Sequence, residues 1–303
     1  MSVVKSFSVG NGDMFYIKHD SDNFTIIDCN MDDTNKKNIV SDIQVAIKDK
    51  RMRRFISTHP DKDHITGLKY LDEQIGLWNF YCVKNKATKS DDFEDFDYYC
   101  KLRDSDIHYY LYKNCERKWM NKSDKNDKEN HGSAGINCLW PVENNEDFKN
   151  ALDLAEEGKA YNNLSPVLTY SLNNGVKVMW MGDIEKDFLE KIKGEINWDE
   201  VDILFAPHHG RDSGKVPSDV LKKLNPSLII IGESPSQHIN YYTGYNTITQ
   251  NSAGDIVFIC EKGWVHIYIS SESYNNGTSF LTDKSKKNDS YGNYIGSLET
   301  KEK

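Results

Sequence analysis

Two histidines and two aspartates lie within one short stretch of this chain, His59-Pro60-Asp61-Lys62-Asp63-His64. The stretch follows the apolar run Phe55-Ile56-Ser57. Burying four such side chains without partners is costly, whereas imidazole nitrogens and carboxylate oxygens are the donors that bind divalent metals. The alternative interpretation is a solvated polar turn. We expect a metal site at the end of a β-strand.

Polar residues recur where other predicted strands end: Asp28, Asp183 and the pair His208-His209. Strand ends that meet at one edge of a sheet sandwich bring their side chains together. A site for two metal ions can then be built from segments that are far apart in the sequence. The strands would hold the donors, and the loops would contact the substrate.

Apolar runs separated by Gly and Asn turns predict strands, and apolar residues at helical spacing predict helices. The predicted strands cover residues 3–9, 14–17, 24–27, 53–57, 167–172, 176–181, 203–206, 228–231, 256–259 and 265–269. The predicted helices cover residues 34–50, 67–73, 94–103, 146–158, 186–194 and 216–224. This order indicates a mixed α/β (α+β) domain over residues 1–270.

Two segments differ from the rest in composition. Residues 83–160 are polar yet rich in Tyr and Phe, which predicts an insertion or lid whose aromatic residues form a local core rather than a stacking surface. Residues 271–303 are rich in Ser, Asn, Lys and Gly, which predicts a disordered tail.

Composition limits the function classes. Of the 303 residues 28% are charged, the mean hydropathy is −0.70, and no apolar run has the length of a membrane span. We therefore expect a cytoplasmic protein with no membrane partner. The 6 cysteines form no CxxC pair, which favours reduced thiols. A net charge of −9 argues against tight binding of long nucleic acid. It does not exclude a nuclease, because two bound divalent metals offset about four charges.

The chain resembles the metallo-β-lactamase-fold hydrolases, and among them the hydrolase domain of the ComEC-type DNA-uptake competence proteins. The resemblance is carried by Val9-Gly10-Asn11-Gly12-Asp13, Ile26-Ile27-Asp28, the segment from Ser57 to Gly67, Gly182-Asp183 and Ala206-Pro207-His208-His209-Gly210. Asn162-Asn163-Leu164-Ser165 also resembles this subgroup. The resemblance implies a metallo-β-lactamase-like αββα sandwich with a polar and aromatic insertion at 83–160.

The resemblance also implies two divalent metals, Zn or Mn. The implied ligands are His59 and Asp61 for the first metal, Asp63, His64 and one of His208 and His209 for the second, and Asp183 as the bridge. The family pattern HxHxDH has a histidine where this chain has Asp61, and Asn162-Asn163 stands where a lone ligand histidine is usual. We therefore expect the first site to be rich in oxygen donors and weakly occupied.

Further roles follow from the resemblance. Asp63, His208 and His209 would be catalytic, and whichever of His208 and His209 does not bind metal would contact the substrate or protonate the leaving group. Asp28 would brace a ligand histidine. The residues expected around the metals or against the substrate are Asn162, Asn163, Arg211, Ser213 and His238, although Arg211, Ser213 and His238 are also consistent with ordinary surface positions. Residues 10–13 either shape the floor of the site or form a tight turn.

The favoured function is a metal-dependent phosphodiesterase or nuclease acting on nucleic acid or a small phosphodiester. One alternative is an amide or thioester hydrolase of the same superfamily. Another is a non-catalytic or partner-binding module of a defence or uptake system, with a protein partner bound through residues 83–160.

Overall fold

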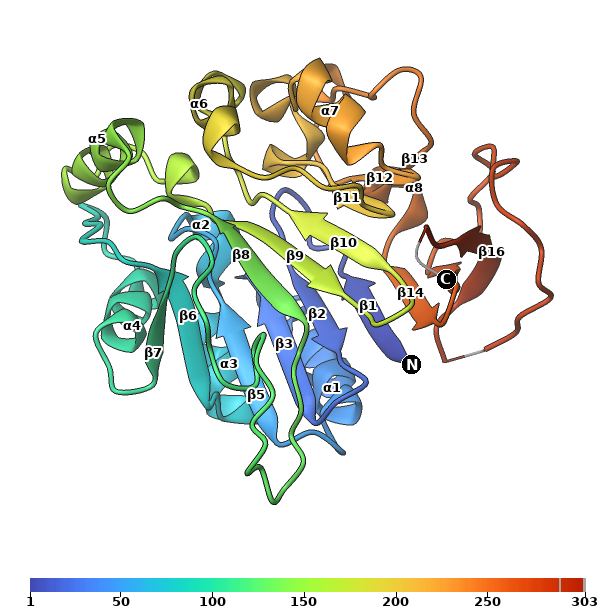
Figure 1. Ribbon diagram of the computed structural model, residues 1–303, viewed down its shortest axis with the longest axis horizontal. Coiled ribbons are helices and arrows are strands. Elements are labelled where there is room, and N and C mark those ends of the chain that lie inside the picture. Colours follow the sequence, from blue (N-terminus) through green and yellow to red (C-terminus); the bar gives the residue numbers. More distant parts are fainter. Residues whose placement is uncertain (289, 302–303) are drawn as a thin grey trace.

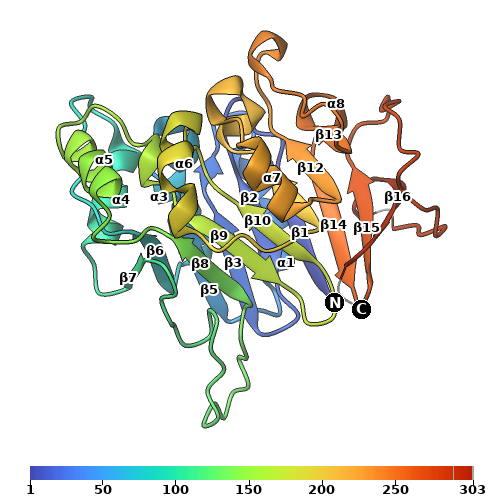
Figure 2. The same cartoon turned by 45° about the horizontal axis from the view of Figure 1, so that its top comes forward.

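Short runs of β-branched and aromatic residues form two β-sheets that pack face to face, with helices on both outer faces (Figure 1). This computed structural model describes residues 1–288 and 290–301. The architecture is the predicted αββα sandwich. Figure 2 shows α6 and α7 in front of the smaller sheet, with α1 on the opposite side of the molecule.

The first sheet has nine strands. Their spatial order is β16 (Asn293–Glu299), β15 (Trp264–Ile269), β14 (Ile256–Glu261), β1 (Ser2–Ser6), β2 (Phe15–Lys18), β3 (Asn23–Ile27), β5 (Met52–Ile56), β6 (Asn79–Val83) and β7 (His108–Leu111). From β3 to β7 the neighbouring strands run parallel. A two-residue strand, β4 (Cys29–Asn30), bridges to Ile65 and Thr66 instead.

The second sheet has six strands. Their order is β13 (Thr247–Thr249), β12 (Leu228–Ile231), β11 (Ile203–Phe205), β10 (Lys177–Trp180), β9 (Val167–Ser171) and β8 (Ile136–Trp140). The strands from β10 to β13 are parallel to one another. Their carboxyl ends therefore meet at one edge of the sheet.

The helices agree with most of the predicted helical segments. They are α1 (Lys36–Ala46), α2 (Lys62–Ile65), α3 (Leu68–Ile75), α4 (Glu94–Arg103), α5 (Glu146–Glu156), α6 (Lys186–Ile192), α7 (Ser218–Leu224) and α8 (Gln250–Ala253). Short 3₁₀ turns are η1 (Asn162–Leu164), η2 (Lys193–Glu195), η3 (His208–Gly210), η4 (Asp212–Gly214) and η5 (Ser236–His238). The helix α4 has the bounds that the sequence predicts.

Aromatic side chains join the two sheets. Phe205 of β11 stacks on Trp180 of β10 with ring centroids 5.1 Å apart, and it meets Phe15 of β2 at 4.8 Å. Phe258 of β14 closes the group at 6.0 Å from Phe205. Aromatic pairs at these separations are stabilised beyond the burial of their area. The group forms an apolar core between the sheets.

The segment predicted as an insertion contributes to both sheets. Within residues 83–160, β7 pairs with β6 at the edge of the first sheet and β8 pairs with β9 at the edge of the second. Phe96 and Tyr99 of α4 are buried. Polar loops dilute the strand signals of this segment, so its composition alone did not reveal the two strands.

The predicted disordered tail is wrong for part of its length. Within residues 271–303, β16 pairs antiparallel with β15, and Leu298 is buried against the core. The strand is short and follows a polar loop, so the mean composition of the tail hid it. In the described ranges no helix combines the length and apolarity needed to cross a membrane.

Candidate metal centre

Parallel strand ends place the predicted site residues at one edge of the sandwich. Ile27 of β3 is aligned with Ile56 of β5, so Asp28 and the residues that begin at Ser57 emerge side by side. In the facing sheet β10 and β11 are parallel, and Asp183 and His209 follow them. The candidate site lies where the two pairs of strands end.

Sharp backbone turns hold these residues. Asp28 has φ 55° and His209 has φ 55°, a region that residues other than Gly seldom adopt. Gly182 has φ 51°, and a Cβ there would lie 2.5 Å from the Ser165 hydroxyl oxygen and 2.9 Å from the Thr58 Cβ. The glycine therefore lets the loop after β10 approach the loop after β5.

Asp28 is fully buried, and its carboxylate holds Thr58 and His64 in place. Its carboxylate accepts hydrogen bonds from the Thr58 backbone N–H at 2.7 Å and the Thr58 hydroxyl at 2.6 Å. Its Oδ2 also lies 2.8 Å from His64 Nδ1. A carboxylate on one ring nitrogen sets the tautomer and leaves Nε2 as the donor to a metal.

Asp183 is the point at which the histidines meet. His64 Nε2 lies 3.3 Å from Asp183 Oδ1, and His209 Nε2 lies 3.3 Å from Asp183 Oδ2. The other ring nitrogen of His209, Nδ1, lies 3.2 Å from Asp13 Oδ1. One potential ligand atom from each of Asp13, His64, Asp183 and His209 lies within 4.8 Å of the other three.

In the described part of the chain, four buried atoms at this point have no hydrogen-bond partner: His59 Nε2, His64 Nε2, His209 Nε2 and Asp183 Oδ1. An unsatisfied buried polar atom costs about 1–3 kcal/mol, so four together are not explained by packing. Imidazole nitrogens with a carboxylate oxygen are a suitable donor set for Zn, Mn or Fe. The residues present therefore fit a divalent metal.

Charges in the centre are strongly coupled. Burial opposes the charged form of His64, but Asp183 and Asp28 raise the pKa of His64 well above its usual value. Burial likewise opposes the charge on His209, and Asp183 and Asp13 raise its pKa well above the usual value. Burial would raise the pKa of Asp183, but the two histidines hold that pKa well below its usual value. Positive charge on His64 and His209 thus offsets the charge of Asp183, and a divalent cation bound at the same point would take over that part from the ring protons.

His59 and Asp63 flank the group. Burial, together with the charge on His64, lowers the pKa of His59 to about 3. The His59 ring lies 4.1 Å from the His64 ring, centroid to centroid. Burial raises the pKa of Asp63, but contact with His209 and the charge on His64 bring it down to about 2. Asp63 Oδ2 lies 3.5 Å from His209 Nε2.

Asp61 lies apart from this group. Its Oδ2 is 3.9 Å from His59 Nε2, and its Oδ1 is 3.4 Å from the Lys89 ammonium. Asn163 is also turned elsewhere: its amide donates to Glu185 at 3.0 Å, and its Oδ1 accepts from the Glu185 backbone N–H at 3.0 Å. Asn162 precedes it in η1, where its backbone carbonyl accepts from Ser165 N–H at 3.1 Å.

The two adjacent histidines differ in position. His209 joins the central group, whereas His208 is partly exposed and its Nε2 lies 3.7 Å from Asp183 Oδ2. His208 Nδ1 lies 3.0 Å from the Ser213 hydroxyl. His208 therefore lies between the centre and the surface.

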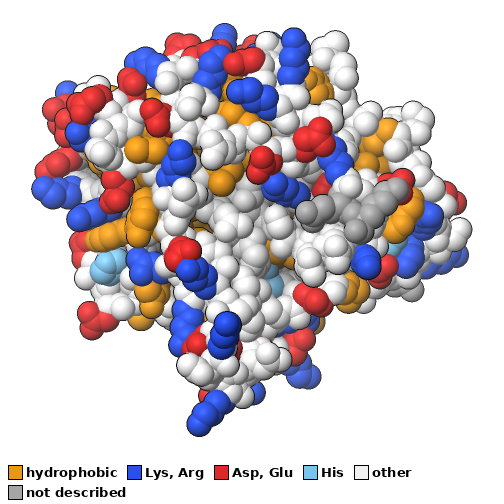
Figure 3. Space-filling view, viewed as in Figure 1, with side chains coloured by type: hydrophobic (Ala, Val, Ile, Leu, Met, Phe, Trp, Pro, Cys, Tyr) orange, Lys and Arg blue, Asp and Glu red, His pale blue; other side chains and the backbone are white. Residues whose placement is uncertain are grey.

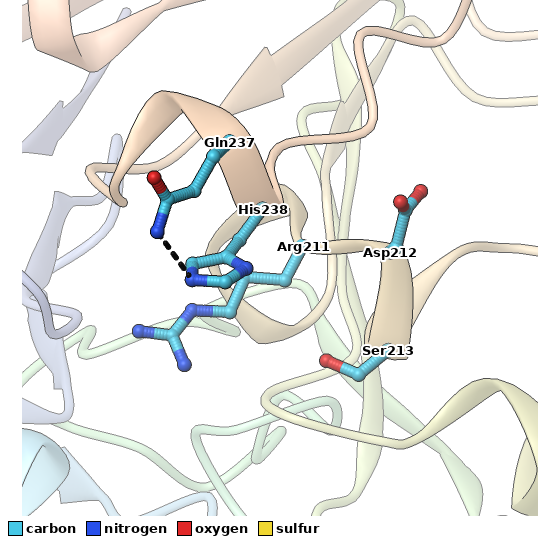
Figure 4. A pocket seen from close by; sticks show the side chains of 5 residues that line it. All are labelled: Arg211, Asp212, Ser213, Gln237 and His238. Atoms are coloured by element: carbon cyan, nitrogen blue, oxygen red, sulfur yellow. Dashed lines mark hydrogen bonds between the residues drawn. The ribbon is translucent and has the colours of Figure 1, made fainter.

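A hollow of about 250 Å³ is lined by Arg211, Asp212, Ser213, Gln237 and His238, and of these Ser213 contacts His208. In Figure 4 the Arg211 guanidinium lies beside the His238 imidazole, while the Asp212 carboxylate is on the far side of the group. Gln237 Nε2 lies 3.2 Å from His238 Nε2. Arg211 is held by the Ser234 hydroxyl at 3.0 Å and by Asn11.

Sequence reasoning missed Lys89, and it gave Asp13 no role of its own, although it took residues 10–13 as either the floor of the site or a tight turn. The sequence offered a signal for Asp13, because it precedes β2, whose first residue Phe15 pairs with Ile27 next to Asp28. The strands β2 and β3 are antiparallel, so the residues before β2 and the residue after β3 lie at the same edge of the sheet. Asp13 therefore lies near Asp28. Lys89 comes from an irregular loop between β6 and α4, and a loop path gives no comparable signal.

No family model and no curated protein matches this chain. Solved structures match it at low identity. The metallo-beta-lactamase fold protein YhfI from Bacillus subtilis is 10% identical over 81% of this chain and 95% of that chain, with a TM-score of 0.41. A mutant metallo-beta-lactamase from Cronobacter sakazakii is 14% identical over 66% of this chain and 75% of that chain, with a TM-score of 0.37. A long form RNase Z from yeast is 12% identical over 82% of this chain and 40% of that chain, with a TM-score of 0.41.

The two-sheet architecture with helices on both outer faces confirms the predicted mixed α/β class and the αββα sandwich. At identities of 10–14% and TM-scores of 0.37–0.41, these three likenesses support no statement on activity. The resemblance to the competence-type subgroup stays a prediction.

Proposed function

We propose that this chain is a metal-dependent hydrolase that cleaves a phosphodiester. The observation that carries the proposal is the meeting of His64, His209 and Asp183, whose buried donor atoms have no hydrogen-bond partner in the described part of the chain. Buried polar atoms in a purely structural core are almost always hydrogen-bonded, so a structural role does not explain these atoms. Clusters of this kind, with strongly shifted pKa values, are characteristic of functional sites.

The ligands we propose for the metal are His64, His209, Asp183 and Asp63. When bound, a Zn or Mn ion polarises the substrate oxygen and lowers the pKa of a water towards neutrality. Asp28 and Asp13 each contact Nδ1 of a proposed ligand, His64 and His209 respectively. They fix the ring orientation so that Nε2 is presented to the centre.

We assign the substrate contacts to the side of the centre where His208 lies. Its Nδ1 is held by Ser213, which leaves Nε2 available to carry a proton to or from a substrate oxygen. The Arg211 guanidinium provides a charged donor to a phosphate oxygen. His238 lies beside it in the hollow (Figure 4).

The surface favours a small phosphodiester or a strand end over a long duplex. On the face shown in Figure 3, Lys and Arg side chains are interspersed with Asp and Glu. Binding of long nucleic acid depends on clustered cations that release counterions, and the net charge is −9. An amide or thioester substrate would not require the Arg211 guanidinium.

The test is a comparison of substrates on one metal-loaded preparation: bis-p-nitrophenyl phosphate, single-stranded DNA, p-nitrophenyl acetate and a chromogenic β-lactam, with added Mn²⁺ or Zn²⁺. We expect cleavage of bis-p-nitrophenyl phosphate that a chelator abolishes and that Arg211→Met weakens by raising KM. Cleavage of the β-lactam or the acetate alone would overturn the substrate class. A loaded protein that cleaves none of them would overturn the proposed activity.

A further inference from the structure

We propose that Lys89 takes the place of a second metal ion, so that this site works with one divalent cation. The inference rests on the proposed function, because it concerns the composition of the same centre. Lys89 is the electrostatic partner of Asp61, which stands where the family pattern HxHxDH has its second histidine.

The Lys89 side chain is built into the protein rather than extended into solvent. Only 11% of the side chain is exposed. Its ammonium lies 5.0 Å from the Tyr161 ring centroid, 5.8 Å from that of Phe96 and 5.9 Å from that of Phe93. Three aromatic rings around one ammonium stabilise the cation and restrict where it can move.

The only carboxylate that the described contacts give this ammonium is that of Asp61, at 3.4 Å. The Asp61 side chain is 32% exposed, so water screens the pair only in part. The same carboxylate lies 3.9 Å from His59 Nε2. Lys89 pairs with Oδ1, whereas the oxygen nearest His59 is Oδ2, so Lys89 neutralises the Asp61 charge and thereby weakens this carboxylate as a ligand for a first-site metal.

With the charge of Asp61 neutralised by Lys89, the predicted first site has few strong donors. Asn163 is bonded to Glu185, which leaves His59 Nε2 and the shared Asp183 among the first-site residues that the structure describes. A catalytic divalent metal is held by about three protein ligands. The ligands proposed above, Asp63, His64, Asp183 and His209, meet that number by themselves. One ion held by these ligands, with the Lys89 ammonium beside Asp61, therefore accounts for the donor groups that the structure brings together.

The experiment counts metal ions directly. Chelator-stripped protein is titrated with Mn²⁺, bound ions are counted by native mass spectrometry, and electron paramagnetic resonance distinguishes an isolated Mn²⁺ from an exchange-coupled pair. Wild type should hold one Mn²⁺ per chain with an isolated-ion spectrum. Lys89→Met frees the Asp61 carboxylate and should tighten binding of a second Mn²⁺ by about tenfold or more, with a coupled spectrum.

Three variants serve as controls. Lys89→Arg keeps the cation and should remain at one ion, and Asp61→Asn should also remain at one ion because Asp61 is not a ligand. Lys86→Met removes a lysine of the same loop that is 79% exposed and pairs with Glu156 at 3.7 Å, and it should behave as wild type. Circular dichroism checks the fold of each variant, and Asp61→Asn decides the question if Lys89→Met does not fold.

Two outcomes overturn the inference. A coupled pair in wild type whose second ion is lost in Asp61→Asn would show that Asp61 is a ligand, and the proposed hydrolase would stand with two metals. An unchanged single ion in folded Lys89→Met would show that Lys89 does not exclude the second. Wild type that binds neither Mn²⁺ nor Zn²⁺ would instead remove the proposed function itself.

Discussion

At the scale of single residues, Asp183 organises the centre. Its two oxygens lie within 3.3 Å of His64 and His209, and His208 lies 3.7 Å away. It is 3% exposed, so its charge interacts with little screening from solvent. Removing one partner of a buried charged group leaves the others unpaired. The strongest effects on function should therefore arise at Asp183 and at the residues it contacts.

Asp183→Ala and Asp63→Ala should each abolish hydrolysis of bis-p-nitrophenyl phosphate while leaving the fold intact. Each substitution removes an oxygen donor from the proposed ligand set. Initial rates with Mn²⁺ measure the loss of hydrolysis, and near-ultraviolet circular dichroism shows whether the fold is intact. Turnover at the wild-type rate in either folded variant would refute the assignment of ligands.

Asp28→Asn should weaken metal binding by about 10–100-fold without removing it. The amide keeps the shape of the side chain, but it loses the charge that orients His64 through the 2.8 Å contact to Nδ1. Competition with a chromogenic chelator measures the dissociation constant. A matched Asp33→Asn variant, whose carboxylate is exposed and pairs with Lys36, should leave it unchanged.

At the scale of elements, much of the site was predictable because strand ends follow from local sequence. The runs before Asp28, His59, Asp183 and His208 have clear strand character, and parallel pairing brings their ends together. Lys89 could not be predicted because its loop has no periodicity. The strands β7, β8 and β16 were missed because polar loops surround them.

The loop after β10 should depend on Gly182. Gly182→Ala places a methyl 2.5 Å from the Ser165 hydroxyl oxygen at a backbone φ of 51°. Forced contacts of this kind cost about 1–3 kcal/mol, and the shift should also weaken metal binding. Urea unfolding measures the loss. Gly194→Ala is the matched control, because a Cβ there meets no described atom within 4 Å. Equal stabilities of the two variants would contradict the close-approach argument.

At the scale of the whole molecule, the two sheets provide a rigid base for the centre. Phe205, Trp180, Phe15 and Phe258 interlock the sheets, and Phe205 ends the strand that leads to His208. Apolar runs in the sequence predicted most of the strands, and the family resemblance implied that they form a sandwich. It did not specify which side chains meet across the sheets, because that depends on the facing sheet.

Phe205→Ala should destabilise the protein by about 3–5 kcal/mol, because it removes a ring that packs against three others. The free energy of unfolding in urea provides the measurement. Trp78→Ala, at a side chain that is 49% exposed, is the aromatic control and should cost about 1 kcal/mol. A loss at Phe205 no larger than at Trp78 would argue against a shared inter-sheet core.

The most direct test of the central claim is equilibrium binding of Mn²⁺ and Zn²⁺ to chelator-stripped protein, compared between wild type and Asp183→Ala. If the buried atoms of His64, His209 and Asp183 form a metal centre, wild type should bind either ion tightly and the variant should lose that binding while remaining folded. Wild type that binds neither ion, or a folded Asp183→Ala that binds them as tightly as wild type, would contradict the assignment of this edge of the sandwich as a metal centre.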